Sequence, residues 1–179
     1  MIKLRKSRDK EAELIDFSDK VVYQIYPKSF CDTNGDGFGD IPGVIKKLDY
    51  LQGLGVDYLW LTPFFISPQR DNGYDVADYR KINPQFGTME DLERLIYESK
   101  KRGMGLMLDM VFNHTSTQHE WFQKALAGEE KYQNYYIFKD GSPDKVPTNW
   151  QSKFGGSAWE YVANLKKWYL RLYDVTQAD

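Results

Sequence analysis

The sequence predicts an α/β fold in which three strand–helix units are followed by a loop-rich segment. Apolar runs of strand length alternate with helical patterns between Val21 and Phe112. This alternation is typical of parallel strands whose two faces are covered by helices. After Asn113 the alternation stops, and Tyr, Trp, Asn and Gly become frequent. We therefore expect a sheet of parallel strands with an insertion after its third strand.

The first unit starts with a strand expected at 21–26 (VVYQIY), where β-branched and aromatic residues precede a proline. A loop rich in Gly and Asp follows. Asp40 is then placed to cap a helix whose first turn contains Pro42. The helix is indicated by apolar residues at i, i+4 and i+7, namely Val44, Leu48 and Leu51.

The second and third units repeat this order. A strand is expected at 58–62 (YLWLT), and after a long polar loop Thr88 can cap a helix that Gly103 ends. The third strand is expected at 106–112 (LMLDMVF), and beyond it only one short helix is expected, at 120–127. Three such units cannot close an eight-stranded barrel, a fold of about 250 residues. The sheet is therefore expected to be incomplete in this chain.

The composition excludes several classes of partner. Among 179 residues, 24 basic side chains nearly balance 26 acidic ones, which argues against nucleic acid and anionic membrane surfaces as partners. No stretch approaches the ~20 apolar residues of a membrane span, and no apolar run completes a secretory signal. The single Cys31 cannot form an internal disulfide. We expect a cytoplasmic, soluble protein that is monomeric at full length and has no organic cofactor.

A loop at 32–40 (DTNGDGFGD) has the oxygen register of a calcium site. Oxygen-bearing residues stand at positions 1, 3, 5 and 9, and a glycine stands at position 6. The expected ligands are Asp32, Asn34, Asp36, Asp40 and the backbone carbonyl oxygen of Phe38. Position 12 lacks the Glu of a complete EF-hand, so Mg²⁺ is a competitor for the site. A plain turn rich in Gly and Asp is the alternative.

Two polar residues mark the end of the third predicted strand. Asp109 is the only charge within that apolar run, and an unpaired buried carboxylate is costly, so it must meet a cation or several donors. His114 follows where the strand ends, at the edge where parallel barrels assemble their sites. A single histidine at a strand end is more often structural than functional, so both readings stay open.

The loop after the second predicted strand contains the run DNGYD at 71–75. The Asp71 carboxylate can accept hydrogen bonds from two sugar hydroxyls, and the Tyr74 ring can stack on a pyranose. An aromatic content of 16% suits a sugar-stacking cleft, although a large aromatic core would also explain it. Taken alone, the run is a polar turn.

Five segments in the same order resemble the alpha-amylase superfamily. They are VVYQIYPKSF at 21–30, the loop at 32–40, DNGYD at 71–75, DMVFNH at 109–114 and FGGSAW at 154–159. Within the superfamily the chain is similar to the oligo-1,6-glucosidase branch, and most of all to its trehalose-6-phosphate hydrolases. The resemblance implies that 21–112 carries the first three strands of a catalytic TIM (β/α)8 barrel and that 113–179 forms an inserted domain B. Residues 1–20 form a divergent N-terminal segment.

The resemblance also implies roles for single residues. The residues expected to contact substrate are Asp71, Tyr74, His114, Phe154, Tyr173 and Gln177. The first three would bind the nonreducing glucosyl ring, and the others would approach from the inserted domain. At Tyr173 the family more often has Phe. Asp109 would be a supporting carboxylate that holds an active-site Arg from a later segment.

The activity implied is retaining hydrolysis of an α-glucosidic bond by double displacement, with one carboxylate as nucleophile and a second carboxyl group as acid. In the resembled proteins this Asp and Glu come from later barrel strands, which places them beyond Asp179, so we expect the chain by itself to be inactive.

The substrate is expected to be a small disaccharide or oligosaccharide. The stretches 147–159 and 174–179 favour trehalose 6-phosphate, cleaved to glucose and glucose 6-phosphate, with Arg70 and Lys153 as candidate phosphate partners. Hydrolysis of isomalto-oligosaccharides is one alternative. A non-catalytic carbohydrate-binding barrel is the other.

Overall fold

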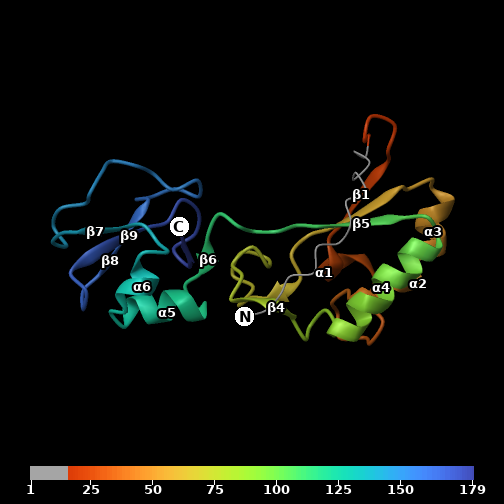
Figure 1. The fold of residues 1–179 in the computed structure, drawn as a ribbon, viewed down its shortest axis with the longest axis horizontal. Coiled ribbons are helices and arrows are strands. Elements are labelled where there is room, and N and C mark those ends of the chain that lie inside the picture. The colour runs from red at the N-terminus through yellow and green to blue at the C-terminus, as the bar shows by residue number, and fades with distance from the viewer. Residues whose placement is uncertain (1–15) are drawn as a thin grey trace, which may run out of the picture.

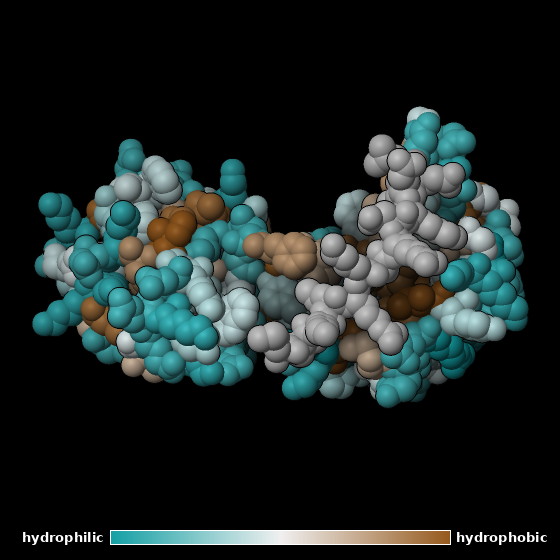
Figure 2. Space-filling model, viewed as in Figure 1, coloured by the Kyte–Doolittle hydropathy of each residue, from teal (hydrophilic) through white to brown (hydrophobic). Residues whose placement is uncertain are grey.

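The computed structural model describes residues 16–179, so most of the divergent segment predicted at 1–20 lies outside the described residues. Figure 1 shows two lobes joined by an extended segment that leaves the third parallel strand. The surface narrows between these lobes in Figure 2. No helix within residues 16–179 combines the length and hydrophobicity needed to span a bilayer.

Three parallel strands form the sheet of the first lobe: β1 (Val22–Ile25), β2 (Tyr58–Leu61) and β5 (Gly105–Leu108). They lie in the order β1-β2-β5. Tyr58 pairs with Gly105, where a Cβ would lie only 2.2 Å from the Tyr58 ring, so the ring can lie over this position because the residue is glycine. The parallel sheet predicted from the alternating pattern is confirmed.

The helices of this lobe are α1 (Pro27–Phe30), α2 (Ile41–Lys46), α3 (Leu48–Gly53) and α4 (Met89–Lys101). Asp40 caps α2 as predicted, because its Oδ1 accepts a hydrogen bond from Gly43 N at 2.6 Å. Thr88 and Asp91 form a reciprocal capping box on α4. The single helix expected after Asp40 is two helices instead, because the backbone at Lys47 (φ −100°, ψ 3°) leaves helical geometry.

The core of the first lobe lies between the sheet and the helices α2, α3 and α4. Its fully buried side chains include Ile25, Leu59, Leu61, Val44, Leu48, Leu51 and Leu95. Full burial of one such side chain contributes about 1.5–3 kcal/mol relative to leaving it in water. The apolar residues whose spacing predicted the first helix therefore form the face that packs on the sheet.

The third strand differs from its prediction. It ends at Leu108 rather than at residue 112, and the side chains of Met107, Leu108 and Phe112 are 37%, 38% and 80% exposed. β5 ends at Leu108 because its partner there is Leu61, the last residue of β2, and no strand among residues 16–179 pairs with the other edge of β5. A strand expected to be covered on both faces thus presents apolar side chains to solvent.

An antiparallel pair, β3 (Phe65–Ile66) and β4 (Asp78–Ile82), occupies the segment predicted as a polar loop. Phe65 pairs with Ile82, and both side chains are buried together with Phe64. The strands are too short for an alternating pattern to reveal them. They matter because their connecting loop carries the DNGYD run.

The second lobe is more ordered than the loop-rich insertion that was predicted. Its helices are α5 (Glu120–Leu126) and α6 (Glu130–Gln133), and the first confirms the predicted short helix. Its strands are β6 (Thr115–Ser116), β7 (Phe138–Asp140), β8 (Trp159–Val162), β9 (Lys167–Leu170) and β10 (Gln177–Ala178). The antiparallel order β7-β9-β8 forms a sheet, and β10 pairs separately with β6.

Aromatic packing holds the second lobe together. One cluster contains Phe122, Tyr136 and Tyr169, and another contains Trp159 and Trp168. The Phe122 ring meets both tyrosine rings edge-on, with centroids 5.0 Å apart in each pair. Part of the high aromatic content is therefore core, which was one of its two predicted explanations.

Candidate functional site

A cavity of 620 Å³ opens where the two lobes meet. Six of the residues singled out in the sequence line it: Asp71, Tyr74, Asp109, His114, Phe154 and Tyr173. They come from the β3–β4 loop, the segment after β5, and the loops that precede β8 and follow β9. The structure thus gathers side chains from both lobes into one place. Their roles toward a ligand remain predictions.

The turn at 71–75 is held in place by its last residue. Asp75 is fully buried and accepts three hydrogen bonds. Gly73 has a φ of +99°, and a Cβ there would lie 2.6 Å from the Pro63 carbonyl oxygen, so the turn requires glycine. The result is a rigid loop that presents Asp71 to the cavity. The donors to Asp75 are Ser67 Oγ (2.7 Å), Arg70 N (3.0 Å) and Asp71 N (3.2 Å).

Gln177 lies behind the cavity wall rather than in it. Its side chain is fully buried, and its Nε2 donates to Asp71 Oδ2 at 2.7 Å. Its Oε1 accepts from Asp174 N at 2.8 Å. Both ends of the amide are therefore engaged within the protein, and the contact of Gln177 with substrate stays a prediction. This hydrogen bond joins the lobes and fixes the orientation of the Asp71 carboxylate.

Asp109 is half-buried, and its partner is a tyrosine. Tyr74 Oη donates to Asp109 Oδ2 at 2.9 Å. Burial, followed by the hydrogen bond to Asp109, raises the pKa of Tyr74 to about 12, so the phenol stays protonated and remains a donor near neutral pH. No Lys, Arg or His among residues 16–179 forms an ion pair with Asp109. The cation expected beside this carboxylate is therefore not in the described part of the chain.

Both ring nitrogens of His114 have polar neighbours. The side chain is 8% exposed, with Nε2 3.1 Å from the Tyr74 carbonyl oxygen and Nδ1 3.2 Å from Asn113 Nδ2. A carbonyl oxygen only accepts and an amide NH₂ only donates, so the neutral ring carries its hydrogen on Nε2. A sugar hydroxyl that reaches Nε2 would share this hydrogen with Tyr74. The ring also packs on Tyr173, with centroids 5.2 Å apart.

Phe154 and Tyr173 approach the cavity from the second lobe as an edge-to-face pair, with centroids 6.0 Å apart. Buried Ser152 connects them, because its Oγ accepts from Phe154 N at 3.1 Å and donates to the Tyr173 carbonyl oxygen. Phe154 is 62% exposed, so its ring is free to meet a ligand. Ser152 was not predicted, and a serine two residues before the aromatic is its only signal in the sequence.

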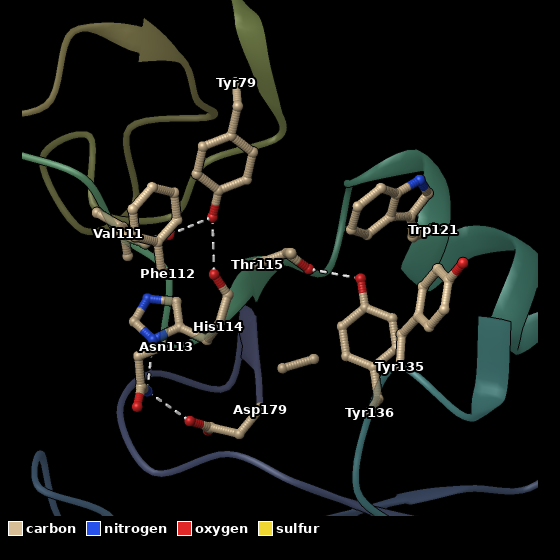
Figure 3. Close-up of a pocket in the computed structure, with 11 residues that line it drawn as sticks. Tyr79, Val111, Phe112, Asn113, His114, Thr115, Trp121, Tyr135, Tyr136 and Asp179 are labelled. Carbon is tan, nitrogen blue, oxygen red and sulfur yellow. Dashed lines mark hydrogen bonds between the residues drawn. The ribbon is translucent and has the colours of Figure 1, made fainter. Parts of the chain in front are cut away.

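Asn113 lines the site cavity and Asp179 is its hydrogen-bond partner, although neither was predicted as a site residue. Asn113 Nδ2 donates to Asp179 Oδ1 at 2.7 Å, as Figure 3 shows, and Leu172 N donates to Asp179 Oδ2 at 2.6 Å. Burial raises the pKa of Asp179. The adjacency of Asn113 to His114 could have identified it.

A second cavity, of 340 Å³, whose lining residues are drawn in Figure 3, shares a wall with the first. The shared wall is the segment 111–114 of the connection between the lobes, and the far side of the second cavity is aromatic. Tyr79, Trp121, Tyr135 and Tyr136 provide that far side. The segment 111–114 therefore lies between the two cavities.

The two candidate phosphate partners do not line the site cavity. Arg70 and Lys153 are both exposed, and neither belongs to the cavity wall. Their backbone NH groups are fixed near the cavity, since Arg70 N donates to Asp75 and Lys153 N donates to the Leu172 carbonyl oxygen. The described residues therefore offer no assembled phosphate site at these positions.

The predicted metal loop already satisfies much of its own hydrogen-bonding capacity. The amides of Gly35 and Gly37 donate to Asp32 and hold the pKa of its carboxyl below the usual range. Asp40 accepts three hydrogen bonds, two from Thr33 and one from Gly43. An ionised carboxylate has about four acceptor positions, so each Asp retains capacity for a cation.

The donor set of this loop fits a hard cation in kind. No three His, Cys, Asp or Glu side chains among residues 16–179 converge as metal ligands, so carboxylates alone would not suffice here. A cation at this loop would need the amide oxygen of Asn34 and the carbonyl oxygen of Phe38 in addition to carboxylates drawn from Asp32, Asp36 and Asp40. All are oxygen ligands of the kind that Ca²⁺ prefers.

Residues 24–179 match the family described as alpha amylase, catalytic domain. The chain is 58% identical over 159 residues to a trehalose-6-phosphate hydrolase of Escherichia coli (strain K12), which covers 89% of this chain and 29% of the relative. It is 50% identical over 164 residues to an oligo-1,6-glucosidase of Bacillus cereus, which covers 91% of this chain and 29% of the relative. The chain thus spans about 29% of the length of these curated relatives.

The structure is also similar to the crystal structure of trehalose-6-phosphate hydrolase from Bacillus licheniformis. The TM-score is 0.86 at 57% identity, over 89% of this chain and 29% of that chain. The chain therefore has part of an alpha-amylase-type TIM-barrel fold. The predicted fold class and the resemblance drawn from the five segments are both confirmed.

Proposed function

Because this chain belongs to the alpha-amylase catalytic-domain family, we propose that it forms the glucosyl-binding part of an enzyme that hydrolyses α-glucosidic bonds. The observation that carries the proposal is the convergence of Asp71, Tyr74, His114, Phe154 and Tyr173 on one cavity. The term whole protein is used below for a polypeptide of the relatives' length that contains this chain.

The cavity offers a sugar two kinds of contact. Asp71 supplies a carboxylate oriented by Gln177, and carboxylates form strong hydrogen bonds with hydroxyl donors. The rings of Phe154 and Tyr173 supply apolar surface for a pyranose face. Holding the glucosyl ring in one orientation brings its anomeric carbon to the reacting groups, which is the contribution we assign to this chain.

The reaction proposed for the whole protein is retaining hydrolysis by double displacement. We place its nucleophile and acid in parts of the whole protein outside this chain. Asp109 would be a supporting carboxylate, because Tyr74 already occupies one of its oxygens. Asp71 would bind rather than attack, since Gln177 fixes it toward the second lobe.

For the substrate we expect the whole protein to hydrolyse trehalose 6-phosphate with a higher kcat/KM than isomaltose. The support is the higher identity to the trehalose-6-phosphate hydrolase, 58% against 50% for the oligo-1,6-glucosidase, together with the stretches 147–159 and 174–179. The measurement is steady-state kinetics with both substrates on one preparation. A preference for isomaltose would assign the protein to the oligo-1,6-glucosidase group, and no turnover of either would contradict the proposed function.

We further propose that the loop at 32–40 binds Ca²⁺, on the strength of its oxygen donors. In the whole protein, Ca²⁺ should raise the melting temperature, because a ligand that binds only the native state at 100 times its Kd adds about 2.7 kcal/mol of stability. Asp36→Ala should remove the response, because it deletes one of the expected ligands at an exposed position. Calorimetry with Ca²⁺ and Mg²⁺ tests this. Equal binding by the parent and the variant would mean that the loop is only a turn.

A further inference from the structure

Tyr79 reaches from β4 to the segment 111–114 (Figure 3), which is the wall shared by the two cavities. Its Oη lies 2.6 Å from the Val111 carbonyl oxygen and 2.9 Å from the His114 carbonyl oxygen. A phenol has one hydrogen, so the two carbonyls share it in a three-centre bond. The Tyr79 side chain thus joins the first and last residues of the segment 111–114.

The two carbonyl groups depend on this hydroxyl. Among residues 16–179, no other hydrogen-bond donor reaches the carbonyl oxygen of Val111 or of His114. Both residues are buried, and a buried carbonyl group without a donor costs free energy. Burial raises the pKa of Tyr79 to about 12, so the donor is present throughout the neutral range.

The Tyr79 ring is itself held on two sides. Its centroid lies 6.3 Å from that of Phe65 and 5.9 Å from that of His119. His119 is fixed in turn, because its Nδ1 accepts from Trp121 N at 3.1 Å at the start of α5. The Tyr79 hydroxyl is therefore held beside the segment 111–114.

The segment 111–114 supplies the site cavity with Phe112, Asn113 and His114, whereas Tyr79 does not line that cavity. We propose that Tyr79 is a positioning residue, whose hydroxyl fixes the segment 111–114 and thereby the place of His114 beside the sugar. This inference rests on the proposed function of the cavity. It means that a residue of β4, which does not line the site cavity, helps to set the geometry of that cavity.

The test is Tyr79→Phe in the whole protein, which keeps the ring packing and removes only the hydroxyl. We expect kcat/KM to fall about 10-fold, the effect of leaving a buried acceptor without its donor. Trp168→Phe is the matched control, because it removes a donor at 3.1 Å from the Ser142 carbonyl oxygen in the second lobe, away from the cavity wall. The control should keep the parent kcat/KM, even if its melting temperature falls more than that of the Tyr79→Phe variant.

A double-mutant cycle with His114→Ala shows whether Tyr79 acts through the segment 111–114. If it does, the loss in the double variant is smaller than the product of the two single losses, since His114 is then already absent. Multiplicative losses, or a Tyr79→Phe variant with unchanged kcat/KM, would overturn the inference alone. An inactive parent would instead overturn the proposed function and this inference with it.

Discussion

Residues 1–179 expressed alone should hydrolyse neither trehalose 6-phosphate nor isomaltose and should show no cooperative thermal transition. The free side of β5 leaves an unpaired strand edge beside the exposed side chains of Met107, Leu108 and Phe112. Open apolar edges of this kind associate with one another. Asp109 would also lack a cation to balance its half-buried charge.

The measurements are size-exclusion chromatography, thermal melting and an activity assay on the purified polypeptide, with the whole protein as the comparison. A monomer with a single sharp melt would contradict the structural reasoning, because the edge would then be harmless. Turnover of either sugar by residues 1–179 would contradict the assignment of nucleophile and acid to parts of the whole protein outside this chain.

Asp71→Asn in the whole protein should lower kcat/KM roughly 10–150-fold, the equivalent of losing a charged hydrogen-bond partner worth about 1.5–3 kcal/mol. The Asn side chain keeps an oxygen that can accept from Gln177, so the link between the lobes survives and only the charge is removed. The loss should be larger in kcat/KM than any change in melting temperature would suggest. Steady-state kinetics and a thermal melt on the same sample measure both.

Asp49→Asn is the matched control for this substitution. Asp49 pairs with Arg102 on the outside of the first lobe, where its side chain is 83% exposed, and exposed ion pairs contribute little. Its kcat/KM should equal that of the parent. If Asp71→Asn also keeps full activity but melts at a lower temperature, Asp71 serves as a link between the lobes and does not bind sugar.

The sequence predicted the parts of the fold in which pattern and packing agree. Val44, Leu48 and Leu51 are all fully buried, and Asp40 caps the helix that they belong to. The break at Lys47 was missed because helical spacing continues across it. The β7-β9-β8 sheet was missed because three short antiparallel strands among Tyr, Trp and Lys resemble loop sequence.

The site was predicted residue by residue but not in its connections. The cavity includes Asp71, His114 and Phe154, which the resemblance had named. Gln177 and Tyr79 act on the site through hydrogen bonds to residues at 71 and 111–114, and no local spacing encodes such a partner. Single residues with suitable chemistry can therefore be found in the sequence, whereas the contacts that orient them depend on the tertiary fold.

The hydrogen bond between Gln177 and Asp71 has a consequence for the order of folding. It joins residues 106 positions apart, whereas the capping box of α4 closes over three residues. Contacts distant in sequence require large loops to close before they stabilise anything, so they form late. Helices and local turns can thus be native while the carboxylate of Asp71 still lacks its partner. The cavity that we propose to bind a glucosyl ring should therefore be complete only when the chain has finished collapsing.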